Sequence, residues 1–100
     1  MNDRAIEFKV NDILVTYNHY CGSRAKFYQV TNNTGKTIKV KAVESNYVDW
    51  SPLTQSGNVV PSNRLSERET LHRIDKFGRT KIGMLTAYLW SGKAEHYDCN

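Results

Sequence analysis

Residues Ala25–Val43 read AKFYQVTNNTGKTIKVKAV, and this stretch decides the fold. Two runs of alternating apolar and polar residues flank the segment NNTGK at 32–36, whose asparagines and glycine accept the positive φ of a tight turn. Successive strand side chains point to opposite sides, so the apolar residues of the IKVKA run share one face while Lys39 and Lys41 share the other. The stretch therefore predicts a β-hairpin with one buried face and one cationic face.

A lone hairpin is only marginally stable in water, so its apolar face must pack on further strands. We expect two short strands at Ile6–Val10 and Ile13–Tyr17, or one strand with a turn between them. A third, Asn58–Pro61, should lie at an edge or an end because proline cannot donate to a ladder. Together these patterns predict an all-β fold, a small barrel of five to seven short strands.

Near the C-terminus, Met84–Trp90 predicts a strand, Ser91-Gly92 a two-residue turn, and Lys93–Tyr97 the returning arm of a second hairpin. The alternating patterns of all these segments also predict which side chains form the core. The expected core residues are Val10, Ile13, Val15, Tyr17, Tyr28, Val30, Ile38, Val40 and Leu89.

Two segments between the expected strands have no regular pattern. Residues 18–24 predict a loop that presents His19, Tyr20 and Arg24, either as ligand contacts or as a plain connector. Residues 44–57 predict an irregular loop, in which turn-forming residues surround Tyr47 and Trp50. Trp50 then either covers one end of the barrel or is exposed as a contact residue.

The segment after Pro61 is open to two interpretations. Ser66-Glu67-Arg68-Glu69 fits a capping box, and the apolar residues that follow recur near helical spacing, which favours a short helix from about Glu67 to Lys76. The rival interpretation makes Thr70–Ile74 a strand, Asp75–Gly78 a turn and Thr80 the start of another strand. We favour the strand, because the apolar support for a helix is weak and the rest of the chain is β in type.

The chain has 100 residues, which predicts a single domain, residues 1–100, just large enough to bury a core. It has no apolar run long enough to span a membrane and no export signal, so we expect a cytoplasmic protein without a membrane partner. Cys21 and Cys99 are then expected as free thiols, with a disulfide as the alternative. A formal net charge of +4 makes an anionic partner more plausible without identifying one.

Three blocks of the sequence resemble a family of small, uncharacterised phage and prophage proteins. Lys9–Val15 is similar to their KVGD opening, although Asn11 stands where those proteins carry glycine. FYQV at 27–30 followed by TGKTIKV at 34–40 resembles their hairpin, and AYLWSGK at 87–93 resembles their closing AxxWDGK segment, with Ser91 in place of aspartate. The resemblance implies an SH3-like barrel of phage origin, brings no catalytic residue with it, and has no counterpart between Glu44 and Leu71.

The sequence contains no arrangement that indicates catalysis or a cofactor. Ser, His and Asp are present, but no pattern sets a nucleophile beside a base. Thr34–Thr37 contains the letters GKT, yet it lacks the earlier glycine of a P-loop and lies between two expected strands. The pairs His19/Cys21 and His96/Cys99 could form a zinc site only if two distant segments met, and their spacing is irregular, so we expect no metal.

The remaining candidate is a cationic surface with interspersed aromatic residues, which could contact a phosphate backbone or a protein. We therefore expect a non-enzymatic accessory protein, a monomer or homodimer, that docks on a host protein or nucleoprotein complex, for example as an inhibitor of a host machine. The alternative is a DNA- or RNA-binding module. The candidate contact residues are Lys36, Lys39, Lys41, Tyr47, Trp50, Arg64, Arg73, Lys76, Arg79 and Lys81.

Overall fold

The computed structural model describes residues 8–18, 24–54, 56–75 and 79–98. They form seven β-strands, and no helix occurs among them, so the all-β prediction is confirmed. No helix able to cross a membrane is found in this part of the chain. The strands are β1 (Ile13–Asn18), β2 (Arg24–Asn33), β3 (Thr37–Ser51), β4 (Ser56–Arg73), β5 (Thr80–Ile82), β6 (Leu85–Leu89) and β7 (Glu95–Asp98).

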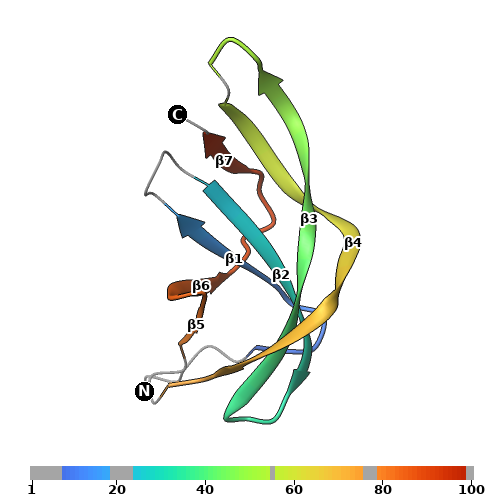
Figure 1. Ribbon diagram of the computed structural model, residues 1–100, viewed down its shortest axis with the longest axis vertical. Helices are drawn as coiled ribbons and strands as arrows, with labels where there is room; N and C mark the ends of the chain where they lie inside the picture. Colours follow the sequence, from blue (N-terminus) through green and yellow to red (C-terminus); the bar gives the residue numbers. More distant parts are fainter. Residues whose placement is uncertain (1–7, 19–23, 55, 76–78, 99–100) are drawn as a thin grey trace.

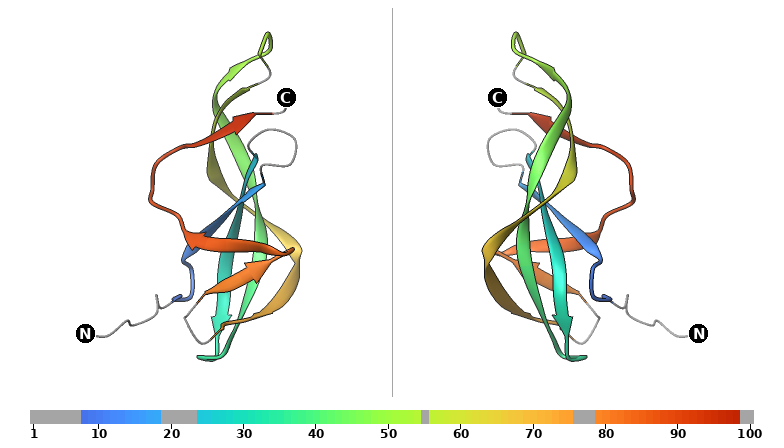
Figure 2. Two further views of the ribbon diagram at one scale, coloured as in Figure 1. Left: turned by 90° about the vertical axis from the view of Figure 1, so that its left-hand side faces the viewer. Right: turned by 90° about the vertical axis from the view of Figure 1, so that its right-hand side faces the viewer.

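The strands form one antiparallel sheet in the order β5-β6-β1-β2-β3-β4-β7 (Figure 1). The sheet curls on itself, and the β5–β6 hairpin crosses the open side of the curl (Figure 2). A single bridge, Ile74 to Thr80, connects the end of β4 to the start of β5. The result is a small barrel-like fold whose sheet is not closed by a continuous ladder.

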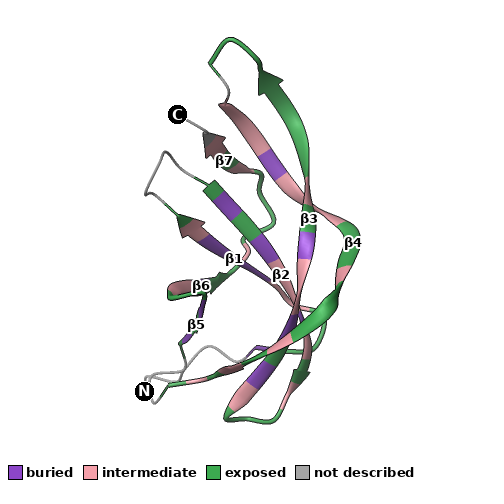
Figure 3. Ribbon diagram, viewed as in Figure 1, coloured by how far each residue is buried: buried purple, intermediate pink, exposed green. Residues whose placement is uncertain are grey.

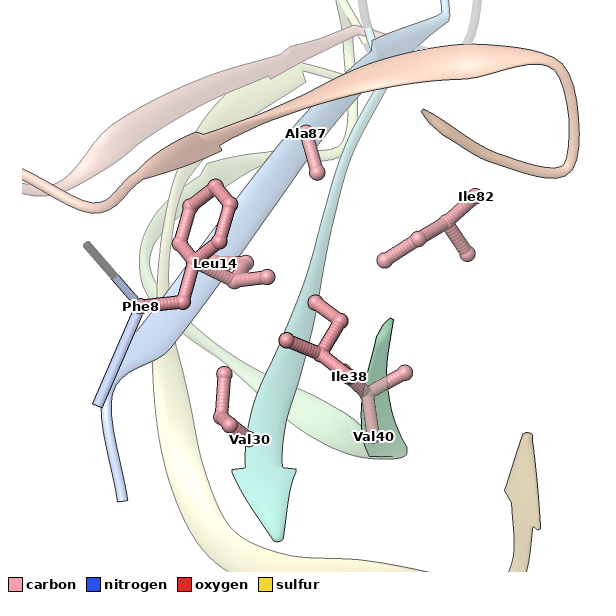
Figure 4. Packing of buried hydrophobic residues seen from close by; sticks show 7 residues of the cluster. All are labelled: Phe8, Leu14, Val30, Ile38, Val40, Ile82 and Ala87. Carbon is pink, nitrogen blue, oxygen red and sulfur yellow. The ribbon is translucent and has the colours of Figure 1, made fainter. Parts of the chain in front are cut away.

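The first hydrophobic core lies inside the curl, between the central strands and the β5–β6 hairpin (Figure 4). Val30, Ile38 and Val40 of the predicted hairpin are at most 1 % exposed, so their assignment to the core is confirmed. Tyr28 packs against this core while remaining half-buried. The buried members are Phe8, Leu14, Val30, Ile38, Val40, Ile82 and Ala87.

A second core lies on the other face of the same strands, formed by Val15, Ala25, Phe27, Val43 and Val59. The ring of Trp90 packs edge-on against Phe27 at 5.8 Å between centroids and covers this face together with Tyr97. Both faces of β1 are therefore covered, and three consecutive residues, Leu14, Val15 and Thr16, are all buried.

Two-sided covering explains why the predicted core list omits some buried residues. An alternating pattern identifies one buried face, but it cannot rank residues on a strand that is covered on both sides. Two residues of the predicted list are exposed: Val10, at 51 %, lies in the turn before β1, and Leu89, at 38 %, is the last residue of β6. Leu14 and Phe27, which we did not assign to the core, are instead fully buried.

The predicted irregular loop at 44–57 is wrong, because β3 runs on to Ser51 and pairs with β4 as far as Ser51–Ser56. The expected short strand at 58–61 is likewise part of an 18-residue strand that continues through Pro61 to Arg73. Register shifts between Lys41 and Asp49 absorb the irregular sequence, which is how β-bulges accommodate residues that do not fit a regular ladder. The strand interpretation of residues 70–74 is confirmed over β4, and the helix interpretation is wrong there.

The predicted C-terminal hairpin is also wrong in its pairing. β6 pairs with β1, while β7 crosses to the far side of the sheet and pairs with β4 from Ser56–Asp98 to Val59–Glu95. The chain cannot fold straight back at Ser91-Gly92, because the intervening segment passes over the second core and buries Trp90 against Phe27. The packing of Trp90 on Phe27 therefore outweighs the local turn preference of Ser91-Gly92.

Val40→Ala should lower the free energy of unfolding by about 1 to 3 kcal/mol, because it removes methyl groups from the first core and leaves a small cavity. Val48→Ala is the matched control, since Val48 lies on the same strand but is 55 % exposed, and its effect should stay within about 0.5 kcal/mol. Urea denaturation of both variants measures the difference. Equal losses would contradict the placement of the core.

Candidate functional site

The predicted cationic face occupies one end of the outward side of β3. Lys41 pairs across the strands with Gln29 and with Glu69, and Lys39 pairs with Leu71, which is 60 % exposed. The Glu69 carboxylate also accepts a hydrogen bond from the Thr31 hydroxyl. The lysines thus lie beside a carboxylate, an amide and an apolar side chain, so this face is mixed rather than uniformly positive.

The other predicted basic residues do not gather into one surface. Arg64 lies 4.0 Å from the Glu44 carboxylate, and the guanidinium of Arg79 lies 3.4 Å from Asp75. Both pairs are exposed, so they contribute little to stability, but they reduce the positive charge available to a partner.

The remaining predicted cations lie on different elements. Lys36 lies in the β2–β3 turn, Arg73 pairs with Thr37 near it, and Lys81 lies on β5. Lys76 falls outside the described residues, as do His19, Cys21 and Cys99 of the sequence arguments. Lys36, Lys39, Lys41 and Arg73 therefore share one end of the sheet. Arg79 and Lys81 flank Thr80, which bridges to Ile74 beside Arg73, whereas Arg64 lies farther along β4.

The far ends of β3 and β4, residues 45–61, form an arm at the top of Figure 1, and β7 pairs with its β4 strand from Ser56 to Val59. Tyr47 and Trp50 lie on this arm with their ring centroids 4.9 Å apart. Tyr97 of β7 completes the group, at 5.8 Å from Tyr47 and 6.2 Å from Trp50. We call these three residues the arm aromatic cluster.

The arm aromatic cluster is accessible although it is packed. Tyr47 is 55 % exposed and Trp50 is 38 % exposed, so Trp50 does not cover the end of the barrel. Val48 on the same strand is 55 % exposed, and Leu53 at the tip is 96 % exposed. Figure 3 shows the β3 side and the tip of the arm in the colour of exposed residues. Contiguous exposed apolar and aromatic residues of this kind mark interaction surfaces more often than isolated ones do.

Two local features shape the arm. The Asp49 carboxylate accepts hydrogen bonds from the backbone and side-chain nitrogens of Asn58, at 2.9 to 3.1 Å, where the ladder shifts register. A Cβ on Gly57 would lie 1.7 Å from the Asp49 carbonyl oxygen, so only glycine fits opposite Trp50. The close approach of the two strands at this point therefore depends on Gly57.

The arm aromatic cluster and the lysines do not form the continuous surface that the sequence predicted. The six-residue step from Lys41 to Tyr47 covers up to about 20 Å of extended chain, because strand residues advance about 3.3 Å each. Tyr97 was missed as a site residue, since its sequence position indicated a hairpin with β6 rather than pairing with Gly57. The one available signal was that Glu95 and Tyr97 lie two residues apart in a run of β type, so that both side chains would share one face of a strand.

A partly buried polar contact attaches β7 to β1. The Tyr17 hydroxyl donates a hydrogen bond to Glu95 Oε1 at 2.9 Å, and Tyr17 also packs on Tyr88 at 6.0 Å. Burial, followed by the hydrogen bond and the charge of Glu95, raises the pKa of Tyr17 to about 12. This contact positions the strand that carries Tyr97.

No group of three or more His, Cys, Asp or Glu side chains that could hold a metal ion occurs among residues 8–18, 24–54, 56–75 and 79–98. Comparisons of the chain with protein-family models, with curated proteins and with solved structures give no match. Function must therefore be argued from the surfaces themselves.

Gly57→Ala should destabilise the protein by about 1 to 3 kcal/mol, because the added Cβ overlaps the Asp49 carbonyl and forces the strands of the arm apart. Ser51→Ala, on the exposed opposite strand, is the control and should change stability by less than about 0.5 kcal/mol. Thermal unfolding of the two variants compares them. A neutral Gly57→Ala would refute the close approach.

Tyr17 should make the protein sensitive to alkali. The pKa of its hydroxyl is raised on folding from 10 to about 12, so the stability that it contributes is fully present below pH 10 and is lost as the pH rises toward 12. The free energy of unfolding should fall over this range, and it should fall less steeply in Tyr17→Phe. A parallel decline in both proteins would count against the Tyr17–Glu95 contact.

Proposed function

We propose that this chain is a non-enzymatic accessory protein of phage type that docks on a host protein through its β3–β4 arm. The observation that carries the proposal is the arm aromatic cluster, in which Tyr47 and Trp50 are exposed on the β3–β4 hairpin and the half-buried Tyr97 of β7 packs against both. Tyr and Trp are enriched among the residues that dominate protein–protein binding energies. Leu53 at the tip adds an apolar contact that no intramolecular packing requires.

The distribution of charge supports a protein partner for the arm. Tyr47, Trp50 and Tyr97 carry no formal charge, and the neighbouring Asp49 carboxylate accepts hydrogen bonds from Asn58, so the charge density at the cluster is low. Depletion of charge with enrichment of aromatic residues is the composition of an interface core. The absence of an enzymatic role rests on the sequence, which has no arranged nucleophile and base.

The resemblance of three sequence blocks to small phage proteins supports the kind of partner. A protein of this size with a projecting apolar arm fits a role in which it occupies a site on a host machine and blocks or redirects it. We place it in the host cytoplasm as a monomer or homodimer. This step is an analogy at the level of the family.

The alternative partner is a nucleic acid bound at the hairpin end, where Lys36, Lys39, Lys41 and Arg73 lie near one another. Glu69 lies within this group and weakens the case for nucleic-acid binding, because a carboxylate beside the lysines repels phosphate. On this alternative, affinity would fall steeply with salt and the double change Lys39→Glu/Lys41→Glu would abolish it.

Tagged protein should capture one stoichiometric host protein from lysate, and the capture should survive nuclease. Binding to the purified partner should weaken by at least about 2 kcal/mol in Trp50→Ala, roughly thirtyfold in Kd, because aromatic anchors dominate such interfaces. Lys39→Gln/Lys41→Gln is the control and should change Kd less than about threefold. Capture that is lost with nuclease, or that depends on the lysines rather than on Trp50, would overturn the proposal.

A further inference from the structure

The inner side of the curled sheet, opposite to Lys39 and Lys41, carries a groove that the sequence did not predict. Two adjoining hollows meet at Lys26 and Tyr28 on β2 and at Ile82-Gly83 at the tip of the β5–β6 hairpin. One hollow extends to Arg24, Tyr47 and Tyr97, and the other extends along β4 to Arg68 and His72. Because the two hollows share these four residues, we treat them as one elongated groove beside the tip of the hairpin.

The charge of this inner groove is positive. Among its described lining residues are three cations, Arg24, Lys26 and Arg68, and a single carboxylate, that of Glu44. The Glu44 carboxylate lies 4.0 Å from Arg64, which partly neutralises it. Arg24, Lys26 and Arg68 are exposed, so their charged groups are accessible to a ligand in the groove.

The inner groove also offers aromatic rings and neutral hydrogen-bonding groups. Lys26 Nζ lies 5.6 Å from the centroid of the half-buried Tyr28 ring, and Tyr47 and Tyr97 lie at one end of the groove. At the other end the Thr70 hydroxyl and His72 Nε2 are 2.7 Å apart. Burial lowers the pKa of His72, against a weaker opposite effect of a backbone hydrogen bond with Lys81, and so favours the neutral imidazole.

We propose that the inner groove binds single-stranded nucleic acid. Cations spaced along an open groove match the repeated phosphates of a strand, and tyrosine rings offer faces on which bases of any sequence can stack. A small anion would need only one of the three cations, whereas a single nucleic-acid strand would use the full length of the groove from Arg24 to Arg68. This goes beyond docking of the arm, since it assigns a second ligand to a groove that shares Tyr47 and Tyr97 with the arm aromatic cluster but takes its cations from Arg24, Lys26 and Arg68.

Fluorescence anisotropy with a labelled 12-nucleotide oligo(dT) tests the proposal. Lys26→Gln/Arg68→Gln should weaken binding at least tenfold, and the slope of log affinity against log salt should become shallower by about 1.4, since each lost phosphate contact of a single strand contributes about 0.7. Lys39→Gln/Lys41→Gln removes the same charge from the other face and should change affinity less than about threefold. Circular dichroism confirms that each variant is folded.

Equal losses in the two double variants would overturn the proposal, because they would show attraction to net charge alone. Undetectable binding by the unaltered protein, or equal competition by an acidic peptide, would overturn it as well.

Ultraviolet cross-linking of a bromouracil oligonucleotide to the unaltered protein does not depend on any variant folding. Cross-links within residues 24–30 or 66–72 would support the groove, and cross-links confined to 36–41 would refute it. Neither result affects the capture of a host protein that depends on Trp50. Failure of the nucleic-acid proposal can therefore be told apart from failure of the docking proposal.

Discussion

The pairing of β3 with β4 is the constraint on which the rest of the structure depends. This ladder extends from Thr37–Arg73 at one end to Ser51–Ser56 at the other, and it takes part in both halves of the molecule. At the first end it brings Ile74 to Thr80 and so connects β4 to β5 beside the first core. At the other end it continues past the barrel as the arm and offers an edge to β7. Register shifts allow one ladder to reach both the β5 end and the arm, because each bulge bends and twists the strands.

The two faces of the central strands carry different chemistry as a consequence. The inner face is apolar under the β5–β6 hairpin and becomes polar and basic where the groove opens. The outer face is apolar where Trp90 and Tyr97 cover it and becomes mixed in charge at Lys39, Lys41 and Glu69. Each face thus combines a packed part with an accessible part. One proposed binding surface is the accessible groove of the inner face, and the other is the arm.

The candidate site could be predicted only in part. Tyr47 and Trp50 were recognisable because large aromatic residues stood among turn formers, and the structure leaves both exposed. Tyr97 could not be recognised, since its place beside them depends on β7 crossing the sheet to β4. Lys26 and Tyr28 of β2 could not be grouped with Arg68 of β4 either, because the two strands face one groove only after the sheet curls.

The sequence by itself determined the central hairpin, the all-β class and the burial of Val30, Ile38 and Val40, because strand alternation and turn chemistry act between neighbouring residues. Only the tertiary structure decided that Tyr47–Ser51 continues a strand, that β4 runs through Pro61, and that β7 pairs with β4. A strand selects its partner through long-range ladder bonds and through burial of side chains such as Trp90 on Phe27. These contributions outweigh local turn preferences and leave no periodic trace in the sequence.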